Sequence, residues 1–241
     1  MKKLTLLVLA LASAAAFMVP ATASAELESL HMSPTPAKLD VAGVGSATLR
    51  SAAGNVTCNG VTGTATPEAG GTTGKLVLTF GPHCTGPTGE TCTSNSPAHT
   101  NGSILTTELT YHLVTIDNVT PTAPSAGVLV TPNAVTGTFA HFNCLVFGFP
   151  VQTTVKGNGV LGTITAPACG ASSTTATMSF KASGGTTTQL HRFTHNATSS
   201  KTTGPWSLTD NSGEAASQEA HATLTATNAA GAATNTELVC T

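Results

Sequence analysis

The sequence predicts an all-β protein, folded as a single antiparallel β-sandwich or β-barrel domain of about 10–12 short strands with disulfides. Three observations predict this fold. Short runs rich in Thr and Val alternate with turn signals of Gly, Pro and Asn, and no long stretch has the period of a helix. Thr makes up about a fifth of the chain, and this β-branched residue favours strands over helices. The chain also contains six cysteines, an even number that suits disulfide bonding.

Residues 1–25 have the three parts of a secretory signal peptide. A basic start at Lys2 and Lys3 precedes an apolar run over residues 4–19 and a small-residue cleavage site that ends at Ala25. The alternative is an N-terminal membrane anchor, but the run is short for a transmembrane helix, and no cysteine follows it for lipid attachment. We therefore expect cleavage before Glu26, a secreted extracellular protein and no membrane span.

Charged side chains are sparse, at 8% of residues against the usual quarter. The chain has 9 basic and 11 acidic residues, and loss of Lys2 and Lys3 with the signal peptide leaves 7 basic against 11 acidic, a formal charge of −4. Such a chain lacks the basic surface that binds nucleic acid or anionic lipid. No phosphate-binding or dinucleotide-binding motif is present, and we expect no cofactor.

The mature chain is expected to comprise a linker over residues 26–38, interrupted by Pro34 and Pro36, and one all-β domain over residues 39–241. Strand candidates cover residues 47–50, 56–66, 76–80, 103–116, 127–131, 177–181, 189–193, 222–227 and 238–239. Residues 213–218 fit one helical turn. The run 103–116 alternates most clearly, with Leu105, Leu109, Tyr111 and Leu113 on one face and Thr106, Glu108, Thr110 and His112 on the other.

Residues 133–165 predict a long β-hairpin that supplies the main share of the apolar side chains of the core. Two β-rich runs flank Phe149-Pro150, and the chain is expected to turn there because proline lacks an N–H and suits a turn. The apolar residues change parity after Gly157-Asn158-Gly159, which predicts a β-bulge at these residues.

A short sequence motif, here called the repeated word, occurs three times, as Asn59-Gly-Val-Thr-Gly-Thr, Asn133-Ala-Val-Thr-Gly-Thr and Asn158-Gly-Val-Leu-Gly-Thr. Its unequal spacing excludes a solenoid array. We interpret the word as one type of strand used three times. The shared glycines, Gly63, Gly137 and Gly162, should lie where strands bend or where backbones approach closely.

The six cysteines predict disulfides, since all of them follow the signal peptide. Cys84 and Cys92 are the first choice for a pair, because the Gly- and Pro-rich interval between them can fold back. The other four favour Cys58–Cys144 with Cys169–Cys240, and the competing set is Cys144–Cys169 with Cys58–Cys240. A thiol or metal site is the functional alternative, but no Cys-x-x-Cys motif supports it.

Several segments together resemble a group of secreted Thr/Gly-rich β proteins of actinobacteria. The signal peptide and the spacing from Phe80 to Cys84 and Cys92 belong to this resemblance. The matching words are Gly54-Asn-Val-Thr-Cys58, Gly102-Ser-Ile-Leu-Thr-Thr-Glu-Leu109, Phe142-Asn-Cys144 and Lys156-Gly-Asn-Gly-Val-Leu-Gly162. The resemblance spans most of the mature chain and implies export and a β fold. It implies no activity and no site residues.

No recognisable catalytic motif is present, and the best metal candidate is the pair His191 and His195. On a strand, residues four apart lie roughly 13 Å apart, too far to share one metal ion. Glu108 and His112 have the same spacing. Trp206 either stacks on a sugar or packs at a sheet edge. A fold-dependent cluster would have to gather its members from Glu108, His112, Asp117, His141 and Asp210.

Three classes of function follow. The first is a non-enzymatic extracellular β module, structural or ligand-binding, and the sequence favours it. The second is a secreted hydrolase built on the acids and histidines named above. The third is a small-molecule carrier with a barrel cavity lined by Phe139, Phe142 and Phe147.

We predict that the exported protein begins at Glu26, because signal peptidase cuts after a small-x-small site. Mass spectrometry of the intact, non-reduced protein from the culture medium checks this. A mass that includes residues 1–25 would contradict the signal-peptide interpretation.

Overall fold

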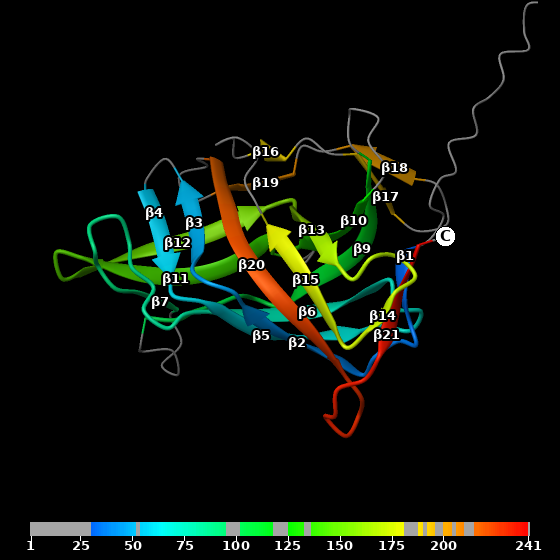
Figure 1. Cartoon of the computed structure of the whole chain (residues 1–241). Coiled ribbons are helices and arrows are strands. Elements are labelled where there is room, and N and C mark those ends of the chain that lie inside the picture. Colours follow the sequence, from blue (N-terminus) through cyan, green and yellow to red (C-terminus); the bar gives the residue numbers. More distant parts are fainter. Residues whose placement is uncertain are drawn as a thin grey trace, which may run out of the picture.

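The computed structural model describes residues 30–51, 54–94, 102–117, 125–132, 136–180, 188–189, 192–195, 200–203, 206–209 and 215–240. These residues form β-strands, turns and loops, and none of them is helical (Figure 1). The strands are β1 (Leu30–Ser33), β2 (Lys38–Gly43), β3 (Ala47–Ser51), β4 (Gly54–Cys58), β5 (Val61–Pro67), β6 (Thr73–Phe80), β7 (Cys92–Ser94), β8 (Ile104–Leu105), β9 (Leu109–Asp117), β10 (Ser125–Thr131), β11 (Thr138–Val146), β12 (Phe149–Gly157), β13 (Val160–Ala166), β14 (Ser172–Ser173), β15 (Thr175–Phe180), β16 (Thr188–Gln189), β17 (Arg192–His195), β18 (Ser200–Thr203), β19 (Trp206–Thr209), β20 (Ala215–Thr227) and β21 (Thr236–Cys240).

Eight antiparallel strands close into a barrel, in the order β2-β5-β6-β9-β10-β13-β15-β20 and back to β2. Closure pairs both edges of every strand, so no edge of the barrel wall is left to recruit another chain. The predicted all-β antiparallel fold with disulfides is therefore confirmed, as a barrel. The described strands outnumber the expected 10–12, because many are two- to four-residue pieces without their own periodic pattern.

A second sheet continues from the barrel, in the order β7-β11-β12-β19-β20-β3-β4. Single bridges from Thr57 to Thr85 and from Thr85 to Thr91 lead from β4 back towards β7. The second sheet is thus nearly closed as well. Strand β20 runs through both sheets. The predicted helical turn over residues 213–218 is wrong in its described part, because residues 215–218 form the start of β20. Figure 1 shows the β11–β12 hairpin extending beyond the second sheet at the left.

A small sheet, β1-β21-β14, lies against the other end of the barrel (Figure 1). Its β1 corrects the predicted linker over residues 26–38, because Leu30 pairs with Cys240 and Met32 with Leu238. Leu30, Met32 and Leu238 are buried. Two alternating apolar residues are too short a pattern to indicate a strand, which is why the sequence missed it.

The barrel interior is filled mainly by aliphatic side chains. Leu109, Tyr111 and Leu113 of β9 are buried as the alternation predicted. Leu105 does not extend this row, because Ile104 and Thr106 are buried in its place and β8 and β9 are separate strands. The predicted amphipathic strand is therefore correct from Leu109 onward and wrong before it.

The predicted central hairpin is β11–β12, but its turn is at Phe147-Gly148 rather than at Phe149-Pro150. Pro150 lies inside β12, opposite Leu145. In a two-residue hairpin this second pair from the turn is a non-hydrogen-bonded one, so proline removes no ladder bond there. The predicted bulge over residues 157–159 is also wrong, because β12 ends at Gly157 and β13 begins at Val160.

The repeated word marks a common strand type in two of its three copies. Gly63 in β5 and Gly162 in β13 both lie in the barrel wall. A Cβ on Gly63 would lie 2.3 Å from the Val77 carbonyl oxygen, and one on Gly162 would lie 2.7 Å from the Phe180 ring. The expected close approach of backbones is confirmed for Gly63, whereas the close neighbour of Gly162 is a side chain. Gly137 instead has φ of 62° in the turn before β11.

The disulfides are Cys58–Cys84, Cys92–Cys144 and Cys169–Cys240. The prediction that all six cysteines pair is confirmed, as is Cys169–Cys240, but Cys84–Cys92 and Cys58–Cys144 are wrong. Cys84 and Cys92 do come together, since the Cys92 N–H donates to the Cys84 carbonyl at 2.9 Å. Each sulfur nevertheless bonds to the neighbouring element, and Cys92 lies directly opposite Cys144 in the β7–β11 register. Loop-closure entropy changes slowly with loop length, so strand register rather than sequence distance decides the pairing.

Replacement of Cys92 and Cys144 by Ala should lower the free energy of unfolding by about 2–4 kcal/mol, because this bridge closes a separation of 52 residues. Urea unfolding under non-reducing conditions measures the loss. Val151→Ala is the matched control, since exposed Val151 faces Cys144 across β11–β12 and should change stability by less than about 0.5 kcal/mol. Equal midpoints for the double variant and the control would contradict the role of this bridge.

Candidate functional site

The structure gives the predicted acid and histidine candidates separate partners. Glu108, before β9, makes an ion pair with Lys75 at 3.6 Å, and both side chains are about half exposed. His141 on β11 is exposed and its Nδ1 is 2.9 Å from the Thr154 hydroxyl. His112 is half-buried on β9, opposite Leu129 of β10. Within the described part of the chain, no three His, Cys, Asp or Glu side chains are grouped to hold a metal ion.

The remaining candidates fall wholly or partly outside the described residues. His191 and Asp210 lie outside them. For Asp117, His195 and Trp206 only the strand positions are described, in β9, β17 and β19. The sugar-stacking and metal-binding roles considered for these residues therefore stay predictions.

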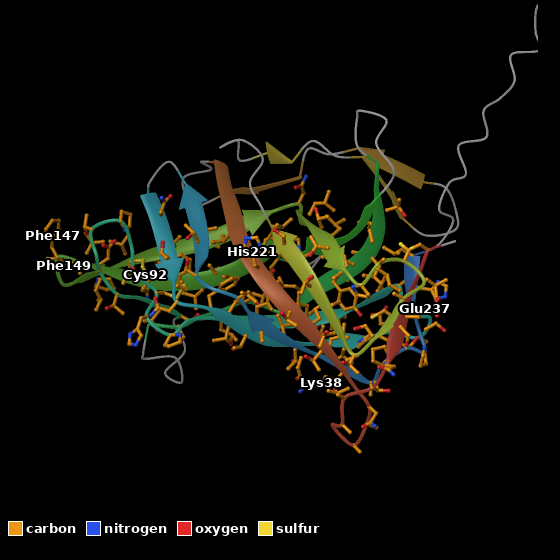
Figure 2. All side chains as sticks on the ribbon, viewed as in Figure 1. Lys38, Cys92, Phe147, Phe149, His221 and Glu237 are labelled. Atoms are coloured by element: carbon orange, nitrogen blue, oxygen red, sulfur yellow. A yellow bond between two sulfur atoms is a disulfide. The ribbon has the colours of Figure 1, made fainter. Side chains whose placement is uncertain are left out.

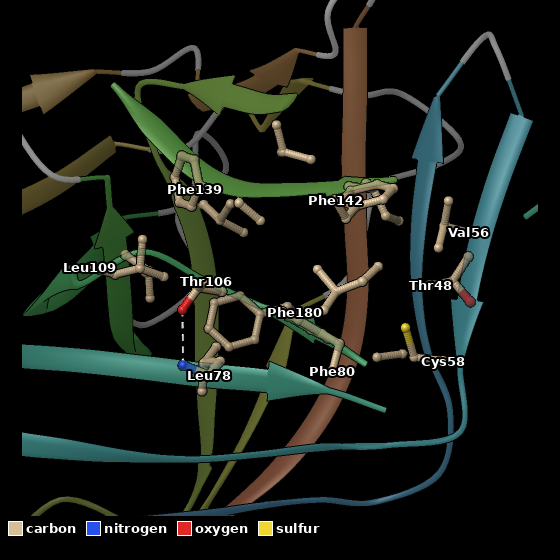
Figure 3. Close-up of a pocket in the computed structure, with 17 residues that line it drawn as sticks. Thr48, Val56, Cys58, Leu78, Phe80, Thr106, Leu109, Phe139, Phe142 and Phe180 are labelled. Atoms are coloured by element: carbon tan, nitrogen blue, oxygen red, sulfur yellow. Dashed lines mark hydrogen bonds between the residues drawn. The ribbon is translucent and has the colours of Figure 1, made fainter. Parts of the chain in front are cut away.

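One small apolar cavity lies between the barrel and the second sheet (Figure 3). Its volume is about 70 Å³, and Phe139, Phe142 and Phe180 contribute rings to its wall. Thr106 is one of its few polar residues, and its hydroxyl already accepts a hydrogen bond from the Leu78 N–H at 2.9 Å. Phe139 and Phe142 line this cavity, which lies beside the barrel rather than inside it as predicted, whereas Phe147 is 92% exposed and lines no part of it.

A second cavity of about 70 Å³ lies where the β1-β21-β14 sheet meets the barrel, and Met32, Tyr111 and Leu238 line it. The Tyr111 hydroxyl is buried with no hydrogen-bond partner among the described residues. Burial and the nearby Glu68 carboxylate raise the Tyr111 pKa well above its usual range, so the phenol stays neutral. Both cavities are well below the roughly 300–1,000 Å³ of ordinary small-molecule pockets.

The most distinctive surface feature is the tip of the β11–β12 hairpin, which we define as residues 145–151. Of the large hydrophobic side chains that are exposed in the described part of the chain, four belong to this tip: Leu145, Phe147, Phe149 and Val151. Figure 2 shows Phe147 and Phe149 at the far end of the hairpin, beyond Cys92. No residue from 142 to 155 carries a charge. Exposed apolar groups clustered in this way commonly mark an interaction site.

Apolar side chains occupy both faces of the tip. Phe142, Cys144 and Val155 are buried, and the strand register places Val146, Phe149 and Val151 on the same face as they are. The core-facing row therefore runs past the end of the second sheet into solvent. Leu145 and Pro150 pair on the opposite face.

The turn at the tip has a costly conformation. Phe147 has φ of 51° and Gly148 has φ of 82°, the pattern of a type I′ turn. Asn-Gly is the usual sequence for such a turn, because a bulky residue in the left-handed region costs roughly 1–2 kcal/mol. An exposed phenylalanine at this position lowers stability without contributing to the core, which favours a functional role.

Backbone contacts secure the base of the tip. The Leu145 N–H donates to the Thr91 carbonyl at 3.0 Å, and Pro150 opposite has no N–H to satisfy. The Cys92–Cys144 disulfide lies one residue further from the turn. The tip is thus held at its base. Neither Leu145 nor Pro150 leaves an unpaired N–H on the side facing away from the hairpin, because the first is hydrogen-bonded and the second has no N–H.

Sequence reasoning assigned this segment to the core. The available signal was the run Leu-Val-Phe-Gly-Phe-Pro-Val over residues 145–151, in which the alternation expected of a half-buried strand is lost. A continuous apolar run is also typical of a fully buried strand, so the sequence could not separate the two cases.

Comparisons with protein-family models, curated protein sequences and solved structures found no match to this chain. Among the described residues, no helix has the length and apolar character needed to cross a membrane. The candidate site therefore depends on the geometry of the tip alone.

Phe147→Asn should raise the free energy of unfolding by about 1 kcal/mol, because Asn tolerates the left-handed conformation of a type I′ turn better than Phe. Phe149→Asn is the matched control. It removes a second exposed ring, but from a strand position where Asn is unfavourable, so stability should be unchanged or lower. Urea unfolding of the two variants measures both effects. A lower stability for Phe147→Asn than for the wild type would contradict the assigned turn strain.

Proposed function

We propose that this protein is a secreted, non-enzymatic binding module that attaches to an extracellular surface through the tip of its β11–β12 hairpin. The exposure of Phe147 (92%) and Phe149 (74%) on an uncharged, projecting hairpin carries this proposal. Burial of each ring against a partner contributes about 1.5–3 kcal/mol before the costs of association. The two rings therefore supply enough energy to matter for binding.

Other features support an extracellular location. Three disulfides suit an oxidising compartment, and the N-terminal segment has the composition of a signal peptide. The resemblance to secreted actinobacterial proteins points the same way. Cavities of about 70 Å³ favour this module over a carrier of drug-sized ligands.

The test compares how the wild type and a tip variant partition between the surface of the exporting cells and the medium. Combined Phe147→Ser and Phe149→Ser should shift the protein towards the medium, with a cell-bound fraction lower by about tenfold or more. Val44→Ser is the matched control, because Val44 is a large aliphatic residue that is 60% exposed elsewhere. Its N–H donates to the His221 carbonyl at 2.8 Å, and His221 lies far from the tip in Figure 2.

Equal retention of the tip variant and the wild type on cells would contradict the proposed function. Thermal unfolding of all three proteins is the folding control: equal unfolding temperatures would show that reduced retention on cells does not come from unfolding of the variant.

A further inference from the structure

The chemistry of the tip identifies one kind of surface. Leu145 and Pro150 are exposed on one face and Phe149 and Val151 on the other, whereas Val146 packs against the core. An apolar medium that surrounds the hairpin covers both exposed faces at once. A flat protein surface would cover only one face. Protein interfaces also add a hydrogen bond for roughly every 100–200 Å², and the side chains of the tip offer none.

The dimensions of the tip fit the same medium. Three residue pairs, from Cys144–Val151 to Val146–Phe149, and the turn beyond them span about 10 Å at the rise of a β-strand. Interfacial membrane segments bury their apolar groups ~5–10 Å into the boundary between headgroups and acyl chains. Peptide groups of the turn remain hydrated in this boundary, whereas an unpaired N–H at the Leu145–Pro150 pair would be costly, and neither residue presents one.

Charge near the tip selects among lipids. Glu90, on the loop that precedes β7, is partly exposed, and hydrogen bonds from the Thr88 hydroxyl and N–H hold the Glu90 pKa below its usual value. Glu90 therefore stays ionised and hydrated at neutral pH. With no charged residue from 142 to 155, attraction to anionic headgroups cannot drive binding at this site.

From these observations we infer that the tip inserts into the interface of an electrically neutral lipid layer, with Phe147 and Phe149 as its anchors. This inference rests on the proposed function and names the partner of the same site. The barrel and the second sheet remain in water, and only the tip of the β11–β12 hairpin enters the lipid.

Co-flotation of the full mature protein with phosphatidylcholine vesicles tests the inference. The wild type and Val44→Ser should float with the vesicles to the same extent, at low salt and at high salt, because the attraction is not electrostatic. The Phe147→Ser and Phe149→Ser double variant should bind about tenfold to a hundredfold more weakly. Vesicles rich in phosphatidylglycerol should bind the wild type no better than neutral vesicles.

Equal flotation of the double variant and the wild type would overturn the inference, as would binding that requires anionic lipid. If the wild type ignores vesicles while its retention on cells still requires the tip, the partner is a protein or another polymer, and only the proposed function stands. If neither vesicle binding nor cell retention depends on the tip, both are overturned.

Discussion

Strand β20 is shared between two sheets, and the remainder of the fold depends on this sharing. Its first residues, Ala216–Glu219, pair with β3 in the second sheet, whereas residues from Ala220 onward pair with β15 and β2 in the barrel. One continuous strand therefore joins the closed barrel to the sheet that contains the β11–β12 hairpin. A second link reinforces this one, because the Thr106–Ala140 bridge and the hydrogen bond from the Thr107 N–H to the Phe139 carbonyl at 2.8 Å join the segment before β9 directly to β11.

This arrangement explains how a chain with few aromatic residues and few charges presents an ordered apolar tip. The barrel leaves no open edge in its wall, and the second sheet is stapled by Cys58–Cys84 and Cys92–Cys144. Figure 2 shows Cys92, one end of the second bridge, on the side of the molecule from which the tip projects. Binding through a tip that is already ordered avoids part of the entropy cost of association, since the hairpin has little freedom left to lose.

Composition, turn signals and the alternation of apolar residues were enough to predict the all-β class, the disulfide bonding of all six cysteines and the buried face of β9. They could not predict the pairing of Cys92 with Cys144, because these residues are 52 positions apart in the sequence and their pairing depends on the register between β7 and β11, which is set by the assembled sheet. Strand β1 was missed because two residues, Leu30 and Met32, carry its whole pattern. The site was missed for a different reason: the apolar run at residues 145–151 has the composition of a core strand, and only the projection of the hairpin beyond the second sheet shows that it is exposed.

Hydrogen–deuterium exchange of the full mature protein, with and without phosphatidylcholine vesicles, is the most direct test of the claim that this tip is the binding element. We expect slower exchange confined to residues 145–151 and the adjoining base at Thr91, with the barrel strands unchanged. Protection that appears instead along the barrel wall or over the β1-β21-β14 sheet, with none at the tip, would contradict it.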